Sequence, residues 1–303
     1  MNGYALLGLA TVVLTAPALS GIIVRTRAVL AGRRGAPVLQ LYYDIAKLLR
    51  KGTVYSTTTT WVFRAAPIVA LVSVLAAAVF VPLDGREALA QFQGDMLAFA
   101  ALLALGRFAL VLAALDTGSS FEGMGASREV TFASFAEPAL FLCFIGLALA
   151  TEQLSLSGIL GSSLGTAWGH AGASLVLVGL SLFIVLLAEN SRVPVDDPTT
   201  HLELTMIHEV IVLDHSGPDL ALILYGSSLK LAVFAALVVA VFVPRATVAQ
   251  PLALGLLLAG LILVAVAVGI VESVMARLRL TRVPQLLVGA GALALVASLL
   301  LLR

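Results

Sequence analysis

Stretches of about 20 consecutive apolar residues recur along this 303-residue chain, and they constrain its fold more than any other feature of the sequence. A helix of about 20 apolar residues is long enough to cross the hydrocarbon core of a bilayer, which is about 30 Å thick. Only 12% of the residues are charged, whereas soluble domains carry about 25%. The sequence therefore predicts an all-α, polytopic integral membrane protein and excludes an ordinary soluble enzyme.

Eight such stretches define a single transmembrane domain over residues 1–303. The predicted spans are 1–24, 65–83, 96–115, 130–151, 171–189, 219–243, 246–271 and 283–302. The first span carries no charge and is followed, not preceded, by Arg25 and Arg27. Because this order is opposite to that of a cleaved signal peptide, we expect residues 1–24 to form a spanning helix.

Basic residues are concentrated in every second connection between the predicted spans. The connections after the first, third, fifth and seventh spans hold 13 of the 18 lysine and arginine residues, whereas the connections in between hold only Arg86 and Arg245. The 13 residues are Arg25, Arg27, Arg33, Arg34, Lys47, Arg50, Lys51, Arg64, Arg128, Arg192, Arg277, Arg279 and Arg282. Because basic residues stay on the cytoplasmic side of a membrane, these four connections are predicted to be cytoplasmic and both termini to lie on the opposite side.

The first of these connections, residues 25–64, is long for a link between membrane helices. It contains a Gly-Arg-Arg-Gly-Ala-Pro turn at 32–37, followed by an amphipathic stretch at 39–49. One interpretation is an interfacial helix whose flanking cations set the topology. The other is a docking platform for a cytoplasmic partner, because a turn that presents Arg33 and Arg34 side by side exceeds what topology requires.

The third cytoplasmic connection, residues 189–219, is acidic, although its side of the membrane favours cations. Its acidic and histidine residues are Glu189, Asp196, Asp197, His201, Glu203, His208, Glu209, Asp214, His215 and Asp219. The alternatives are a solvated acidic loop, a metal site at His201, Glu203, His208 and Glu209, or a buried carboxylate and imidazole cluster. The metal site is disfavoured because the segment has no HExxH motif and adjacent residues point to different helix faces. The buried cluster suits proton relay, since burial and proximity shift pKa values towards neutrality.

Six ionisable residues lie within or at the ends of the predicted spans. They are Arg107, Asp116, Glu137, Glu189, Lys230 and Glu272. A charge at mid-membrane costs about 3 kcal/mol and by default marks an ion pathway or a buried pair. Glu137 precedes Pro138, which removes a helix hydrogen bond and would admit water. Glu137 could simply pair with Arg107 or Lys230, but six such residues favour a proton-conducting chain of carboxylates with a lysine.

Several classes of protein and site are excluded. The sequence contains neither a GxxxxGK[ST] nucleotide-binding motif nor a GxSxG hydrolase motif. Gly123-x-Gly125 is predicted to lie in a connection without a flanking strand, so it does not indicate a dinucleotide site. No span holds the paired histidines of a haem site, and a single Cys143 excludes a disulfide framework and cysteine-ligated clusters. A net charge of +1 does not indicate nucleic-acid binding.

Four segments, in this order, resemble a known family of membrane subunits. They are Gly32-Arg33-Arg34-Gly35-Ala36-Pro37-Val38-Leu39-Gln40 with Asp44-x-x-Lys47-Leu48-Leu49; Leu115-Asp116-Thr117-Gly118-Ser119-x-Phe121-x-Gly123-x-Gly125-Ala126-Ser127-Arg128-Glu129; Glu189-x-x-Arg192-x-Pro194-x-Asp196; and Glu272-Ser273-x-Met275-Ala276-Arg277-Leu278-Arg279-Leu280. Together they are similar to NADH dehydrogenase subunit 1, which joins the membrane and peripheral arms in the complex I superfamily. The second and fourth segments resemble its hydrogenase branch, the membrane subunits of group 4 NiFe hydrogenases such as formate hydrogenlyase.

This resemblance implies a non-redox subunit that conducts protons or another ion and anchors a soluble module. The expected partners are the hydrogenase-like small (iron–sulfur) and large subunits, antiporter-like membrane subunits and the lipid bilayer. NiFe and iron–sulfur clusters are expected in those partners, and no cofactor or metal in this chain. The residues assigned to docking are Arg33, Arg34, Asp44, Lys47 and Arg192. The residues assigned to the ion path are Arg107, Asp116, Glu137, Glu189, Asp196, Glu203, Glu209, Lys230 and Glu272.

The third cytoplasmic connection departs from the quinone-reducing relatives. Val195 replaces the Phe of a Pro-Phe-Asp motif, and Thr199 and His201 replace two glutamates, whereas Glu203 is retained. These departures disfavour quinone binding. We therefore expect a coupling subunit of an energy-converting hydrogenase in a bacterial or archaeal cytoplasmic membrane. The alternatives are a quinone-chamber subunit of an NADH:quinone oxidoreductase and a stand-alone secondary transporter, in which the long basic connection would have no role.

Overall fold

The computed structural model describes residues 3–196 and 207–302. These residues form helices and no strand, and eight of the helices are long and apolar enough to cross a membrane. They are α1 (Gly3–Leu30), α3 (Trp61–Val79), α4 (Asp95–Asp116), α5 (Ser120–Thr151), α7 (Ser162–Glu189), α9 (Gly217–Phe242), α10 (Gln250–Val274) and α11 (Val283–Leu301), which a 3-10 turn, η1 (Leu280–Arg282), precedes. The predicted all-α architecture with eight spans is confirmed.

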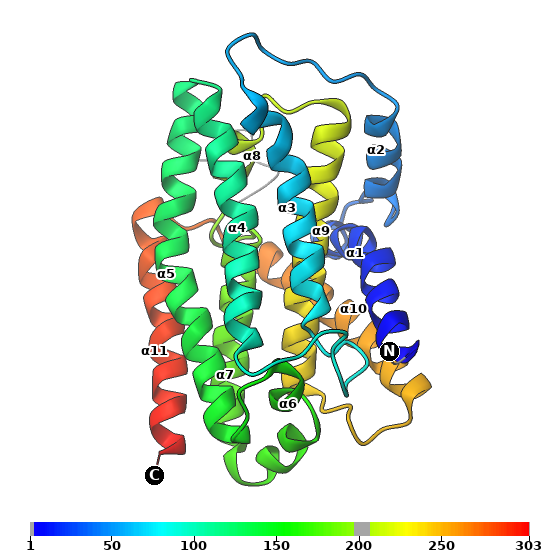
Figure 1. The fold of residues 1–303 in the computed structure, drawn as a ribbon, viewed down its shortest axis with the longest axis vertical. Helices are drawn as coiled ribbons and strands as arrows, with labels where there is room; N and C mark the ends of the chain where they lie inside the picture. The colour runs from blue at the N-terminus through cyan, green and yellow to red at the C-terminus, as the bar shows by residue number, and fades with distance from the viewer. Residues whose placement is uncertain (1–2, 197–206, 303) are drawn as a thin grey trace.

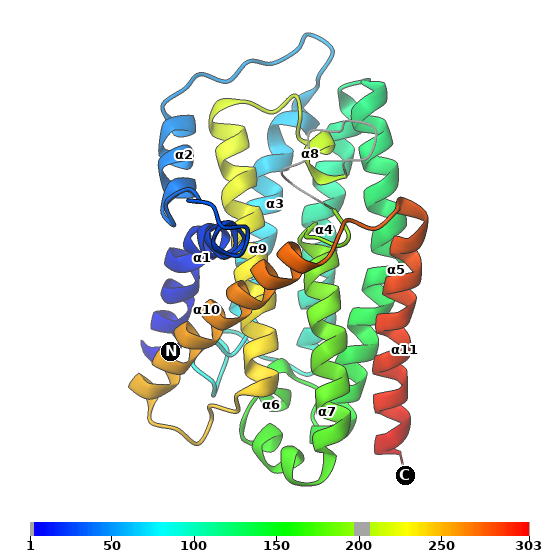
Figure 2. The ribbon, with the colours of Figure 1, turned by 180° about the vertical axis from the view of Figure 1, so that it is seen from behind.

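Helix α9 lies at the centre of the bundle, where α1, α3, α7 and α10 pack around it (Figures 1 and 2). Residues 231–241 of α9 are buried on every side, as expected for a helix that is hydrophobic all round. Helices α5, α7 and α11 pack together on one side, and α3 packs along α4. The bundle therefore places α4, α5, α7 and α9 so that side chains from all four can meet.

Three short helices lie outside or between the spans: α2 (Gln40–Leu49), α6 (Leu156–Ile159) and α8 (His208–Ile211). Helix α2 confirms the amphipathic stretch predicted at 39–49, and it lies beside α1 (Figure 1). The Tyr42 hydroxyl donates to the carbonyl oxygen of Leu14 in α1. A Cβ at Gly21 would overlap the carbonyl oxygen of Val38, so only glycine permits this close approach to α1.

Several predicted boundaries are wrong. Helix α5 begins at Ser120, ten residues before the predicted span, so Gly123 and Gly125 lie in a helix and not in a connection. A 32-residue helix is about 48 Å long at about 1.5 Å per residue, which exceeds the apolar core of about 30 Å. Its polar first turns were therefore invisible to a search for apolar spans. Helix α7 begins at Ser162, and its non-helical Ala171 lies where the predicted span began.

The connections alternate between the two ends of the bundle. Helix α2, the α4–α5 connection and α8 lie at one end, whereas α6 and the α3–α4 and α9–α10 connections lie at the other (Figure 1). This alternation is the one that the distribution of basic residues predicts.

Single-cysteine labelling tests which end is cytoplasmic. Because Cys143 is buried, it should give little background. Cysteine at exposed Ala36 should react with an impermeant maleimide only after the cells are opened, whereas cysteine at exposed Gln93 should react in intact cells. Labelling of position 36 from outside would reverse the predicted topology.

Candidate functional site

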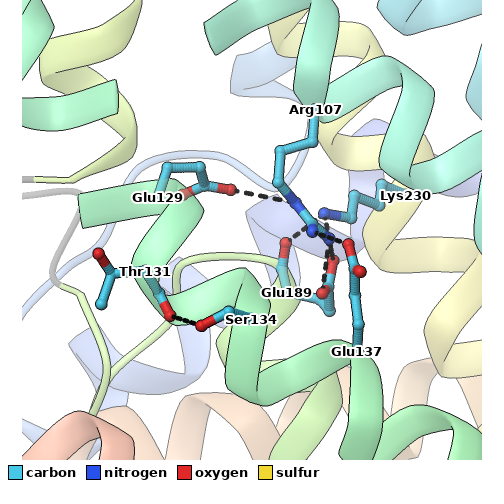
Figure 3. Close-up of polar contacts among 7 residues, drawn as sticks. All are labelled: Arg107, Glu129, Thr131, Ser134, Glu137, Glu189 and Lys230. Carbon is cyan, nitrogen blue, oxygen red and sulfur yellow. Dashed lines mark hydrogen bonds and ion pairs between the residues drawn. The ribbon is translucent and has the colours of Figure 1, made fainter. Parts of the chain in front are cut away.

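Arg107, on α4, joins carboxylates from two other helices (Figure 3). Its Nη1 lies 2.5 Å from Oε1 of Glu137 on α5, and its Nη2 lies 2.7 and 2.6 Å from Oε1 and Oε2 of Glu189 on α7. Its Nε lies 3.6 Å from Oε1 of Glu129, also on α5. Lys230, on α9, completes the group: its Nζ lies 2.7 Å from Oε2 of Glu189 and donates to the Glu189 carbonyl oxygen at 2.6 Å. These five residues are called the Arg107 cluster below.

The Arg107 cluster lies deep in the bundle. Residues 107 and 116 are nine positions apart on α4, so Arg107 lies about 14 Å from the C-terminal end of that helix at about 1.5 Å per residue. The Arg107 and Glu189 side chains are 9% and 3% exposed. With three carboxylates and two cations, the cluster carries a formal charge of −1 when all its members are ionised. A charged group at this depth is stable only when paired, which explains why Arg107 contacts three acids.

Helix α5 is locally weakened beside Glu137. Pro138 lies inside the helix and has no N–H, so the carbonyl oxygen of Ser134 loses its usual partner. The Ser134 hydroxyl donates to the Thr131 carbonyl oxygen at 2.7 Å (Figure 3). The Thr131 hydroxyl in turn donates to the Ser127 carbonyl oxygen at 2.8 Å. Such side-chain bonds to the preceding turn tend to bend helices. The backbone around Glu137 is therefore easier to deform than an uninterrupted helix.

A cavity of about 260 Å³ borders the Arg107 cluster. Its charged and titratable lining residues are Arg107, Glu129, Glu189, Arg192, Asp196, His208, Glu209 and Lys230. The remaining wall is largely apolar and includes Leu103, Val111 and Ile223. Burial lowers the pKa of His208, which Glu129 partly offsets, so the imidazole is neutral at pH 7. The cavity therefore combines an apolar wall with groups that can exchange protons.

A second group of ion pairs lies between α1, α10 and the segment after α7. Glu272 lies 3.6 Å from both Arg27 and Arg192, and Arg192 also donates to the Ser20 hydroxyl at 3.3 Å. The Arg192 side chain is only 14% exposed, and burial lowers the pKa of its guanidinium. Arg192, which was assigned to docking, is therefore much less accessible to a partner than the exposed Arg33 and Arg34.

Of the other predicted path residues, Asp116 lies apart from the Arg107 cluster, whereas Asp196 and Glu209 line the cavity beside it. Asp116 caps α3 instead, accepting from the Thr60 amide at 2.6 Å and from its hydroxyl at 2.9 Å. Asp196 pairs with Arg277 at 2.7 Å and accepts from the amides of residues 207 and 208. Glu209 lines the cavity. Glu203 lies outside the described residues.

The metal interpretation gains no support from the described residues. Neither 3–196 nor 207–302 contains a group of three or more histidine, cysteine, aspartate or glutamate side chains that could hold an ion. His201 and Glu203, which belonged to that interpretation, lie outside the described residues.

The other residues assigned to docking lie on or next to α2. Arg33, Arg34 and Lys47 are exposed, and Asp44 accepts a hydrogen bond from Gln40 at 2.9 Å. They therefore remain accessible to a partner at this end of the molecule.

Sequence reasoning missed Glu129 as a member of the cluster. Glu129 was placed in a connection, because the predicted span began at residue 130. Residues 129 and 137 are eight positions apart, which is close to two helical turns and puts both on one face of α5. Continuing the helix back from Glu137 would have found it. The buried Glu122, which accepts from the Asp214 amide at 3.0 Å, was missed for the same reason.

The fold and the buried charges define a class of helical membrane protein with an ion-pair network at its centre. Residues 4–302 match the NADH dehydrogenase family, and the chain belongs to the NADH dehydrogenase subunit 1 family. It is 34% identical to hydrogenase-4 component C of Escherichia coli over 90% of this chain and 87% of that protein. It is also 34% identical to formate hydrogenlyase subunit 4 of the same organism over 93% of each chain. The chain is therefore a multi-pass membrane protein.

A more distant relative shares less of the sequence, and a chain of a solved structure shares the fold. A subunit of the NADH-quinone oxidoreductase of Rubrobacter xylanophilus is 28% identical over 70% of this chain and 62% of that protein. A chain of the membrane-bound sulfane sulfur reductase, an archaeal respiratory membrane complex, superposes with a TM-score of 0.82 over 98% of each chain at 18% identity. The predicted resemblance to the hydrogenase branch is confirmed, because the relatives from hydrogenase-4 and formate hydrogenlyase share more sequence with this chain than the NADH-quinone oxidoreductase relative does.

Proposed function

We propose that this chain is the membrane-anchoring and ion-coupling subunit of an energy-converting, hydrogenase-type complex. It binds a soluble redox module at the end that carries α2 and contacts antiporter-like subunits within the membrane. The complex lies in a bacterial or archaeal cytoplasmic membrane, with both termini of this chain on the outer side. The nearer relatives belong to hydrogenase-4 and formate hydrogenlyase, which supports this proposal.

The observation that carries the proposal is the Arg107 cluster at the wall of the cavity. A single structural ion pair would need one arginine and one carboxylate, whereas Arg107 reaches three carboxylates from α5 and α7. A carboxylate that loses an arginine contact binds a proton more readily. Small movements of α4 against α5 could therefore pass a proton between Glu189 and Glu137 by switching which of them Arg107 holds.

Quinone binding is the second candidate, and the cavity favours it. Its volume of about 260 Å³ and its apolar wall approach the properties of small-molecule sites, which measure about 300–1,000 Å³. Val195, which replaces a Phe found in quinone-reducing relatives, argues against it. In this second account the chain would assemble with a quinone-reducing module instead of a hydrogenase-like one.

Copurification with a charge-reversed variant tests the proposal. The wild-type chain, solubilised in mild detergent, should retain a soluble hydrogenase-like module and antiporter-like membrane proteins. The double variant Arg33→Glu, Arg34→Glu should still insert, because both residues are exposed and outside the spans. It should release the soluble module, because like charges at an interface cost several kcal/mol.

Arg86→Glu is the matched control, since Arg86 is exposed at the opposite end of the bundle. It should leave the complex intact. A quinone-reducing assembly would favour the second candidate, and a chain that purifies alone would indicate a stand-alone transporter. A double variant that keeps its soluble module would show that Arg33 and Arg34 act only in topology.

A further inference from the structure

Glu137 is the most exposed member of the Arg107 cluster. Its side chain is 38% exposed, whereas those of Glu129 and Lys230 are 16% and 15% exposed. Because Glu137 is level with Arg107, it lies about 14 Å from the end of α4, within the depth of the hydrocarbon core. A carboxylate that faces lipid at this depth is unfavourable. Something other than lipid chains must therefore cover it.

The charges of the cluster indicate what kind of group would cover Glu137. Oε1 of Glu137 contacts Arg107, but within 3–196 and 207–302 its Oε2 has no partner. The two cations of the cluster face three carboxylates, so one negative charge is uncompensated, and Glu137 presents it outward. A hydrogen-bond donor with positive charge would satisfy both the free oxygen and the excess charge.

The surface of α5 beside Glu137 differs from that of a lipid-facing helix. Ser127, Thr131 and Ser134 are exposed at intervals of four and three residues, and therefore form one stripe along α5. The hydroxyls of Thr131 and Ser134 are already bonded within the helix, so the stripe presents small side chains whose hydroxyl donors are largely satisfied. Large apolar residues are exposed on α5 as well as on α10, for example Val130 and Leu263, so this face of α5 is distinguished by small hydroxyl residues that lie beside a charged side chain. Small residues let another membrane helix approach closely.

We propose that a transmembrane helix of a partner subunit covers the face of α5 that carries this stripe, and presents a basic side chain to Glu137. The inference rests on the proposed function and adds to it the face at which the membrane partner binds. A protonated Glu137 could pass its proton to a neutral amine on that helix, leaving a carboxylate and an ammonium group. Glu137 is then the position at which the ion path leaves this chain.

Tryptophan substitution tests the proposed interface in the assembled complex. Ser134→Trp adds bulk at an exposed position, so the isolated chain should insert and remain monodisperse. It should reduce copurified membrane partners at least tenfold while the soluble module stays bound. Leu263→Trp, at a residue that is 69% exposed on α10, is the matched control and should retain all partners. If both variants retain the same partners, the proposed interface is wrong.

Photocrosslinking gives a second readout that does not depend on weakened binding. A benzoylphenylalanine at position 134 should crosslink to a membrane-spanning peptide of another subunit, whereas one at position 263 should crosslink to lipid. Crosslinks from position 134 to lipid alone would overturn the inference while leaving the proposed function intact. A wild-type chain without any copurifying subunit would overturn both.

Discussion

Replacing Glu189 with Gln is expected to lower the free energy of unfolding by about 3–5 kcal/mol, because the substitution breaks a buried ion pair. Glu189 is 3% exposed and contacts both Arg107 and Lys230. Glutamine keeps the shape of the side chain but removes the negative charge that the two cations share. A buried cation without a counter-charge is strongly unfavourable, and Lys230 would become one, so the loss should appear in denaturant or thermal unfolding of the detergent-solubilised chain.

Two further variants show whether charge or packing causes this loss. Glu137→Gln should cost only about 1 kcal/mol, because Glu137 is partly exposed and Arg107 keeps its contacts with Glu189. Adding Lys230→Met to Glu189→Gln removes the cation that is left without a carboxylate and should restore part of the stability. Equal losses for Glu189→Gln and Glu137→Gln, or no recovery in the double variant, would contradict this assignment of the charges.

The second large effect concerns ion movement and not stability. Glu137→Gln should leave the complex assembled and its redox activity present, but abolish coupled ion translocation. Glutamine can still accept a hydrogen bond from Arg107, yet it cannot take up or release a proton. If Glu137 served only to pair with Arg107, this substitution would affect stability and assembly, and any complex that formed would still translocate ions.

The spans could be predicted from the sequence because their apolar length is set by the membrane. Where a helix extends beyond the membrane, its run of apolar residues ends before the helix does. Helix α5 continues ten residues beyond its predicted start at 130, through polar residues that aqueous surroundings tolerate. The amphipathic pattern of α2, by contrast, was readable because its apolar and polar faces alternate within one short helix.

The sequence indicated which charged residues belong to the candidate site, but not which of them contact one another. Charges within apolar spans marked Arg107, Glu137 and Lys230, because such residues are costly there without a role. The spacing of the residues along the sequence could not decide whether Glu137 belonged to a single ion pair or to a series of interacting carboxylates. The answer depends on how α4, α5 and α7 pack, which places Arg107 between Glu137 and Glu189. Packing likewise places Arg192 against Glu272 and Ser20, contacts that its position in the sequence did not indicate.

The two acids of the cluster have different roles in this account. Glu189 is buried between two cations and holds α4, α7 and α9 together, so stability depends most on its charge. Glu137 has one arginine contact, partial exposure and a proline beside it, so it is the member that can change partners. Loss of the Glu189 charge should therefore lower the stability of the chain. Loss of the Glu137 charge should uncouple ion translocation from redox turnover.

Acidification of proteoliposomes during redox turnover shows whether Glu137 carries the translocated proton. Wild-type complex and the Glu137→Gln complex, matched for subunit content and for redox turnover, are compared with a pH-sensitive dye. We expect the wild-type complex to form a pH gradient and the Glu137→Gln complex to form none at equal redox turnover. Both results should be the same with and without a sodium ionophore. A gradient of wild-type size in the Glu137→Gln complex would contradict the role of Glu137 in the ion path.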